Sequence, residues 1–235
     1  MPTQVRSLVV GGTSGIGREI ARALAARGEE LVITGRELAR AQTAAAELGD
    51  RHRGLALDLS QPQEVASRLA EVAGPIDHLV LSAVERDQNA VRNYDIGRAT
   101  RAITLKVVGY TAVVHALAPR LASGASIVIL GGIARDWPYP GSTTISMANG
   151  AVSSMVRTLA VELAPVRVNA VHPGGVGDSP AVRAMPPAMI ESIRARTPTG
   201  RLATMADVAA ATLALLDNPA INGVNLTVDG GFLFT

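Results

Sequence analysis

Short apolar segments alternate with segments of helical periodicity along almost the whole chain. Such alternation is typical of βα units, whose strands lie parallel in one sheet while the helices cover both of its faces. The sequence therefore predicts an α/β fold with a doubly wound sheet of about seven mainly parallel strands. The predicted strands are residues 7–10, 31–34, 54–57, 78–82, 126–130, 167–171 and 224–228. The predicted helices are residues 17–27, 37–48, 62–73, 96–121, 143–163 and 205–216.

The chain reads as a single domain over residues 1–235. Of its 235 residues, 48% are apolar and 18% are charged, which is enough apolar surface for a large core. No linker, internal repeat or low-complexity segment divides it. Residues 173–200 are rich in proline and follow a predicted strand, so we predict that they form a lid over the carboxyl ends of the strands.

Composition argues against several classes of site and partner. The chain has no cysteine and its four histidines lack ligand spacing, so we expect no disulfide and no metal site. The pI is about 9.5, yet the net charge is only +2 and the arginines form no run, so we expect no nucleic-acid partner. The sequence shows no apolar run of bilayer length and no signal segment. We therefore expect a cytoplasmic protein with no membrane partner.

Glycines cluster directly after the first predicted strand, in the segment GGTSGIG at residues 11–17, which leads into an Ala-rich helix. Glycines permit the tight turn and let the backbone approach a phosphate, while the free N–H groups at the start of the helix bind anions. A strand, such a turn and a helix in this order predict the dinucleotide-binding turn of a Rossmann-type fold.

The Gly-x-x-x-Gly-x-Gly spacing of this turn resembles the short-chain dehydrogenase/reductase family. Asp58-Leu59 resembles the family's adenine contact, residues 168–174 resemble its segment facing nicotinamide, and residues 223–231 resemble its C-terminal segment. Residues 157–165 are also similar. The resemblance spans residues 5–231 and implies an NAD(P)-binding Rossmann fold with a small-molecule substrate.

The resemblance implies cofactor contacts at the ends of several predicted strands, and the position of Arg36 adds a further one. They are Gly11, Thr13, Ser14, Gly15, Ile16, Gly17, Arg36, Asp58, Leu59, Ala83, Pro173, Gly174 and Val176.

Arg36 bears on which dinucleotide is bound. Enzymes that prefer NAD usually carry an acid at the end of the second strand to hold the ribose 2′-hydroxyl, whereas this chain reads Thr-Gly-Arg at residues 34–36. A guanidinium there can pair with a 2′-phosphate, and Thr13 and Ser14 can add hydroxyl donors. The sequence favours NADP(H), with a solvated surface arginine as the alternative interpretation of Arg36.

The family's Asn-Ser-Tyr-Lys proton relay is missing from the matching positions. The alignment places Lys106 at the Asn position, Gly132 at the Ser position, Ile145 at the Tyr position and Asn149 at the Lys position. The only nearby tyrosine, Tyr139, has no lysine four residues after it. We interpret the chain as a divergent member without the usual acid, whose loss costs about 10² to 10⁴ in rate.

Three residues are candidates for replacing the lost acid, and each has a structural alternative. Lys106, the only lysine, borders an apolar helical stripe and could act as an acid or hold a hydroxyl, or simply extend along its helix. Tyr139 could be a substitute acid or a packed aromatic side chain. Asp178 matches the family's carboxamide contact and could instead cap the following helix.

We predict an NADP(H)-dependent oxidoreductase that transfers hydride to or from an iminium or an enone rather than a simple ketone, because those substrates do not need the Tyr acid. Asp178 could stabilise the iminium cation. A non-catalytic NADP(H)-binding regulator or partner subunit is the alternative, and fold alone does not decide between them. Family members commonly form homo-oligomers through the long fourth and fifth helices and the C-terminal segment, so we expect a dimer or tetramer. The small and flexible side chains suited to that packing are Ala148, Ala151, Val152 and Met155.

Overall fold

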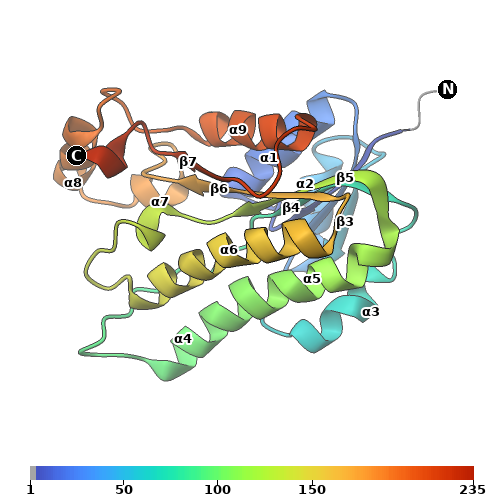
Figure 1. Cartoon of the computed structure of the whole chain (residues 1–235), viewed down its shortest axis with the longest axis horizontal. Coiled ribbons are helices and arrows are strands. Elements are labelled where there is room, and N and C mark those ends of the chain that lie inside the picture. Colours follow the sequence, from blue (N-terminus) through green and yellow to red (C-terminus); the bar gives the residue numbers. More distant parts are fainter. Residues whose placement is uncertain (1–3) are drawn as a thin grey trace.

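The computed structural model describes residues 4–235, which form one seven-stranded sheet with strand order β3-β2-β1-β4-β5-β6-β7. Every neighbouring pair of strands is parallel. Figure 1 shows the sheet lying between layers of helices. The strands are β1 (Arg6–Val10), β2 (Glu30–Gly35), β3 (Arg53–Ala56), β4 (Ile76–Leu81), β5 (Leu121–Leu130), β6 (Arg167–Pro173) and β7 (Asn225–Val228). The predicted α/β fold with a doubly wound sheet is confirmed.

Helices cover both faces of this sheet (Figure 1). They are α1 (Gly15–Ala26), α2 (Leu38–Ala46), α3 (Val65–Leu69), α4 (Ile96–Ile103), α5 (Tyr110–Leu117), α6 (Thr143–Glu162), α7 (Pro180–Arg183), α8 (Pro187–Arg196) and α9 (Met205–Asp217). One apolar cluster joins the sheet to α3, α5 and α6, and a second joins it to α1, α2 and α9. The alternating apolar segments of the sequence are therefore the strands buried between two helical layers.

The structure corrects three of the predicted elements. The helix predicted at 62–73 is a 3-10 turn, Pro62–Glu64, followed by the short α3, which ends at Leu69. The strand predicted at 126–130 begins at Leu121. The proposed lid contains α7 and α8, which the proline content of the sequence concealed.

The helix predicted at 96–121 is a continuous helical run with an unpredicted change of geometry. A π-helical segment, Thr104–Gly109, separates α4 from α5. By length and hydropathy alone, the run Ile96–Arg120 is long and apolar enough to span a membrane, which the sequence analysis did not anticipate. Its side chains Tyr110, Val113 and Leu117 are fully buried, so core packing accounts for this apolar character.

Because all strands are parallel, their carboxyl ends meet at one edge of the sheet. The strand order reverses between β1 and β4, which is the position where ligands bind in open α/β sheets. There the glycine turn touches the segment after β4: a Cβ on Gly11 would lie 2.5 Å from the backbone nitrogen of Ala83. The fold thus places the glycine turn, the end of β4 and the start of α6 around one edge.

Candidate functional site

The glycine turn forms the first part of the site. Gly17 has no room for a side chain, because a Cβ there would collide with Ser82 Oγ and with the Gly11 carbonyl. Gly15 has a φ of +55° and faces open space at the start of α1. The Ser14 side chain forms no capping hydrogen bond. The bare backbone and the free N–H groups of this helix start are the features that hold a dinucleotide pyrophosphate, so this turn fits that group.

The ends of β2 and β3 form the neighbouring part of the site. The Thr13 side chain lies against Gly35, the last residue of β2, where a Cβ would lie 2.6 Å from Thr13 Cγ2. Burial alone would raise the pKa of Asp58, but hydrogen bonds from Ser60 and the charges of Arg101 and Arg36 hold it below its usual value. Asp58 is therefore ionised and lies within the field of Arg36.

Leu59, predicted at the adenine, has its side chain in the core. The Leu59 side chain is only 2% exposed. Its carbonyl oxygen would lie 2.6 Å from a Cβ on Gly109, so Gly109 has to lack a side chain there. Only the backbone of Leu59 can therefore face a nucleotide. Ala83 is also fixed through its backbone, because its carbonyl accepts a hydrogen bond from the Tyr110 hydroxyl at 2.5 Å.

Lys106 and Asn149 meet at the other end of the site. Lys106 lies in the π-helical segment, and its ammonium Nζ donates to Asn149 Oδ1 on α6 at 3.0 Å. Because an ammonium can only donate, the amide oxygen must face Lys106 and the amide nitrogen must point away from it. A Cβ on Gly132 would lie 2.8 Å from Asn149 Nδ2. The missing side chain at Gly132 thus leaves room for this nitrogen.

The Lys106 ammonium is buried without a counterion. The residue is 5% exposed, and no carboxylate among residues 4–235 forms an ion pair with it. Burial lowers its pKa to about 8, so it remains mostly protonated at neutral pH. A charge held this way polarises the Asn149 amide strongly, because the surrounding protein screens it little.

His172 supports the loop that carries Gly132. It is fully buried, its Nδ1 accepts from the Gly132 N–H at 3.2 Å, and its Nε2 lies 2.9 Å from Asn225 Oδ1. Burial, with the nearby charges of Arg135 and Lys106, lowers its pKa to about 4. His172 is therefore a neutral support for the site at pH 7, with Nε2–H as the donor to Asn225.

The other two predicted acids, Tyr139 and Asp178, form no hydrogen bond with this pair within residues 4–235. Tyr139 is 50% exposed in the loop before α6, and within the described chain no hydrogen bond joins its hydroxyl to Lys106 or Asn149. Asp178 Oδ1 accepts the backbone N–H of Met205 at 2.8 Å. Asp178 thus accepts the first backbone N–H of α9, whose N-cap is Thr204, while Ser179 is the N-cap of the following helix α7.

The segment after β6 closes the far side of the site. Pro173 ends β6, and the Gly174 N–H donates to the Val228 carbonyl at 3.0 Å. Val176 is buried and pairs with Ala203 through an isolated parallel bridge. The start of the predicted lid is thus fastened to β7 and to the segment before α9.

Comparison with known proteins gives the family. The family model described as "Enoyl-(Acyl carrier protein) reductase" matches residues 10–233. A solved short-chain dehydrogenase/reductase from Brucella melitensis, described as a glucose/ribitol dehydrogenase, superposes with a TM-score of 0.91 at 28% identity, covering 97% of this chain and 96% of the other. The chain belongs to the short-chain dehydrogenase/reductase family.

Curated members of the short-chain dehydrogenase/reductase family agree over nearly the full length. The mouse (Mus musculus) protein named 3-oxoacyl-[acyl-carrier-protein] reductase is 32% identical, with 97% of each chain covered. The cis-4-hydroxycyclohexanecarboxylate dehydrogenase of Sinomonas cyclohexanicum is 34% identical, with 96% of this chain and 95% of the relative covered. Membership implies an oxidoreductase fold that takes NAD(P)(H), and the cradle around Gly15 fits such a nucleotide.

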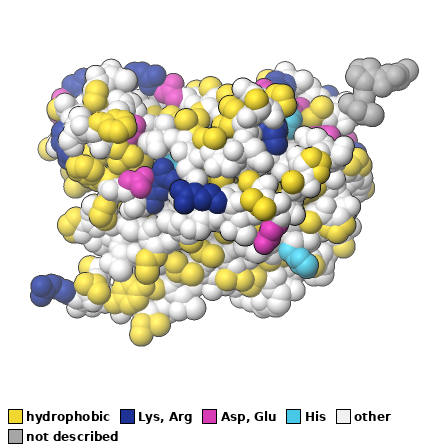
Figure 2. All heavy atoms as spheres, viewed as in Figure 1, with side chains coloured by type: hydrophobic (Ala, Val, Ile, Leu, Met, Phe, Trp, Pro, Cys, Tyr) yellow, Lys and Arg dark blue, Asp and Glu magenta, His cyan; other side chains and the backbone are white. Residues whose placement is uncertain are grey.

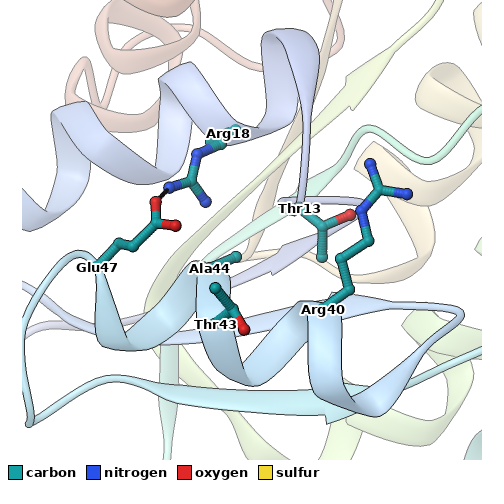
Figure 3. A pocket seen from close by; sticks show the side chains of 6 residues that line it. All are labelled: Thr13, Arg18, Arg40, Thr43, Ala44 and Glu47. Carbon is teal, nitrogen blue, oxygen red and sulfur yellow. Dashed lines mark hydrogen bonds and ion pairs between the residues drawn. The ribbon is translucent and has the colours of Figure 1, made fainter.

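Sequence reasoning identified Lys106 and Asn149 separately and missed their contact, which joins residues 43 positions apart. It also missed Arg40, which lines a hollow beside Thr13 (Figure 3). Arg40 lies in the first turn of α2, whereas Arg36 precedes the N-cap Glu37, so no helical spacing in the sequence relates the two.

Proposed function

We propose that this short-chain dehydrogenase/reductase homologue is an NADP(H)-dependent oxidoreductase that reduces the conjugated carbon–carbon double bond of an enone-type carbonyl compound. The observation that carries this proposal is the contact between Lys106 and Asn149 at 3.0 Å, which turns a polarised amide N–H₂ toward the space beside Gly132. We start from the alignment that places four residues at the family's relay positions: Lys106, Gly132, Ile145 and Asn149.

The cofactor part of the proposal rests on charge at the end of β2. Arg36 follows Gly35 there, with no acid in residues 34–36 to bind a ribose 2′-hydroxyl. Bound NADPH would supply the hydride. The chain itself supplies the pyrophosphate cradle at Gly15 and cationic groups around the ribose.

Asn149 would act as a hydrogen-bond donor and not as an acid. An amide cannot give up a proton at neutral pH, but its N–H can stabilise negative charge that develops on a substrate oxygen. In conjugate reduction the β-carbon accepts hydride, the double-bond electrons shift to give an enolate, and water protonates the α-carbon. The oxygen then needs a donor and no proton, which is what Asn149 and Lys106 offer.

The same site disfavours the iminium substrate that the sequence left open. Lys106 places a buried positive charge next to Asn149, and a cationic substrate would be repelled by it. The carboxylate proposed to stabilise that cation, Asp178, instead accepts the backbone N–H of Met205. The enone therefore remains the substrate class that the charges support.

Oxidation of NADPH with a matched pair of substrates tests this function. We expect the enzyme to reduce cyclohexenone at least about 10²-fold faster than cyclohexanone, because only the saturated ketone requires a proton on oxygen. Asn149→Ala should lower the rate with cyclohexenone by about 10²-fold, the loss typical of removing one oxyanion donor. The readout is the decay of reduced nicotinamide absorbance with purified protein.

Two outcomes of this screen would contradict the proposal. Equal rates for the two substrates would show that an acid is present after all. Absence of turnover with cyclohexenone, with cyclohexanone, with a cyclic imine and with an α,β-unsaturated thioester would support the non-catalytic regulator or partner subunit.

We further propose that the protein is a homo-oligomer whose chains pair through the outer faces of α4 and α6. The residues that can contact a partner chain differ from those expected from the sequence. Ala148 and Val152 are buried inside the protomer at 1% and 0% exposure, so they cannot face a partner. The outward residues of α6 include Met147 and Val161, which are 51% and 79% exposed. In Figure 2, hydrophobic side chains lie over the region of these helices. Exposed apolar surface of this kind favours self-association.

Light scattering tests the oligomer. We expect a mass of at least twice the 24.3 kDa of one chain at micromolar concentration. Val161→Asp should shift the mass toward that of one chain, since a carboxylate cannot be buried unpaired in such an interface. Val91→Asp, which changes another exposed valine in the loop before α4, should leave the mass unchanged. A wild-type mass of 24.3 kDa would refute the proposal.

A further inference from the structure

Three segments that are far apart in the sequence meet around the side chain of Arg196, the last residue of α8. Trp137 comes from the loop after β5, which also carries Gly132. Phe232 comes from the 3-10 turn that follows β7. Figure 1 shows α8 and the C-terminal turn at the same end of the molecule.

The guanidinium of Arg196 lies over two aromatic rings. Its Cζ is 4.9 Å from the centroid of the Trp137 ring and 4.7 Å from that of Phe232. The two rings meet edge to face, with their centroids 5.5 Å apart and an angle of 71° between their planes. Both distances to the cation lie within the about 6 Å over which the face of an aromatic ring attracts a positive charge. The two rings therefore hold the Arg196 side chain together.

No carboxylate of residues 4–235 competes for this guanidinium. Glu191, the acid of the same helix, pairs with Arg194 at 2.7 Å. The hydrogen bond that Arg196 makes runs from Nη2 to the Thr235 carbonyl at 3.1 Å. Stacking on the rings of Trp137 and Phe232 is therefore the main interaction of the Arg196 side chain.

The rest of α8 is held by little apolar burial. None of its 10 residues is buried. Ile193 packs toward Gly175, where a Cβ would lie 3.4 Å from Ile193 Cγ2. In contrast, the residue after the helix, Thr197, is 3% exposed and packs against Gly230. A helix with one anchored end and little burial along its length is the kind of segment that opens locally at a small cost in free energy.

Trp137 connects this contact to the candidate site. Its backbone N–H donates to the Ile133 carbonyl at 2.8 Å, so it continues the 3-10 turn Ile133–Arg135. That turn begins directly after Gly132, where the Asn149 amide nitrogen lies close by. The contact between Arg196 and Trp137 thus fixes α8 to the segment that borders the space proposed for the substrate.

We propose that Arg196 and Trp137 form a latch that holds α8 closed over the site, and that this contact breaks each time substrate enters or product leaves. The inference rests on the proposed lid of residues 173–200 and not on the class of substrate. Phe232, which is 7% exposed, is the positioning residue that keeps the Trp137 ring in place. A guanidinium suits a latch because it stacks on a ring while its N–H groups still face water, so closing buries no unpaired charge.

Hydrogen exchange of the full chain without ligand measures the opening of α8. We expect Arg196→Gln to speed exchange of the α8 amides by about 10-fold and to leave α6 and α9 at wild-type rates, because only the latch is lost. Arg194→Gln is the matched control. It removes the same charge from the same helix, at a residue paired with Glu191, and should change α8 exchange by less than about 2-fold.

A double-variant cycle shows whether the two side chains act as one contact. Trp137→Leu keeps an apolar side chain and removes the ring, so it should also speed exchange of α8. Because either change already breaks the latch, the double variant should exchange no faster than the faster single variant. Effects that simply add, faster exchange throughout the chain, or wild-type exchange in Arg196→Gln would overturn the latch.

Cross-linking tests whether α8 has to open during turnover. The chain has no cysteine, so Trp137→Cys together with Arg196→Cys provides two unique thiols for a bis-maleimide whose spacer a reductant cleaves. We expect the cross-link to slow NADPH oxidation with cyclohexenone by at least about 10-fold, and cleavage of the spacer to restore the rate. An unchanged rate in the cross-linked chain would show that α8 does not need to move.

The outcomes separate this inference from the proposed function. If α8 exchange responds as expected and the wild-type chain does not reduce cyclohexenone, the latch stands and the proposed substrate class is wrong. If the wild-type chain reduces cyclohexenone and α8 exchange is the same in Arg196→Gln, the latch alone is overturned.

Discussion

Replacing Lys106 with methionine is expected to lower turnover of an enone by at least about 10²-fold while leaving NADPH binding unchanged. Methionine keeps most of the bulk but removes the ammonium that orients and polarises Asn149 at 3.0 Å. The loss should appear in kcat and not in KM, because the polarised amide acts mainly on charge that develops in the transition state. Steady-state kinetics with the wild-type and variant chains measure it.

The pH dependence of the two chains distinguishes this role from a structural one. Wild-type turnover should fall as the pH rises through about 8, where Lys106 loses its proton, and the remaining activity of Lys106→Met should lack that step. If both chains share one pH profile, or if the variant keeps wild-type kcat, Lys106 does not act through Asn149.

The free energy of unfolding should also depend on the protonation of Lys106. Burial lowers the Lys106 pKa from 10.5 to about 8, so between these values the unfolded chain binds more protons than the folded one. Unfolding free energy therefore gains a contribution that rises with pH over this interval, by about 3 kcal/mol in total, and is flat below pH 8. Denaturant unfolding at several pH values should show this rise in the wild-type chain and not in Lys106→Met.

Rebuilding the family's acid should confer reduction of a simple ketone. We expect the triple variant Ile145→Tyr, Asn149→Lys and Lys106→Asn to reduce cyclohexanone at least about 10²-fold faster than the wild-type chain. The structure shows why Lys106 has to change as well. It lies 3.0 Å from the Asn149 side chain, so Asn149→Lys alone would set two ammonium groups against each other in a buried site.

The double variant that keeps Lys106 is the control for this gain. It should remain as slow as the wild-type chain, or lose stability, because one of the two buried ammonium groups must give up its proton. Equal gains in the double and triple variants would show that Lys106 and Asn149 do not interact. A folded triple variant that binds NADPH and gains no ketone reduction would show that Ile145 does not stand at the position of the acid.

Local patterns explain which parts of the fold were predictable. All seven strands were predicted. The five inner strands are largely apolar segments covered on both faces, whereas β3 and β7 at the sheet edges are only partly buried. The glycine turn was predictable because a collision with Ser82 or with Ala83 excludes a side chain at Gly17 and at Gly11. Element ends and helix subtype were less accessible, as α3 and the π-helical segment before α5 show.

The amino-acid sequence by itself determined the sheet, its helical layers and the turn that fits a dinucleotide, because periodicity and glycine spacing are local properties of the chain. Only the tertiary structure decided that Lys106 meets Asn149, that Asp178 accepts the backbone N–H of Met205 at the start of α9, and that Arg40 lines a hollow beside Thr13. These contacts join residues on different helices and loops. They depend on strand register and helix packing, which place side chains distant in the sequence within hydrogen-bond reach and which no local pattern specifies.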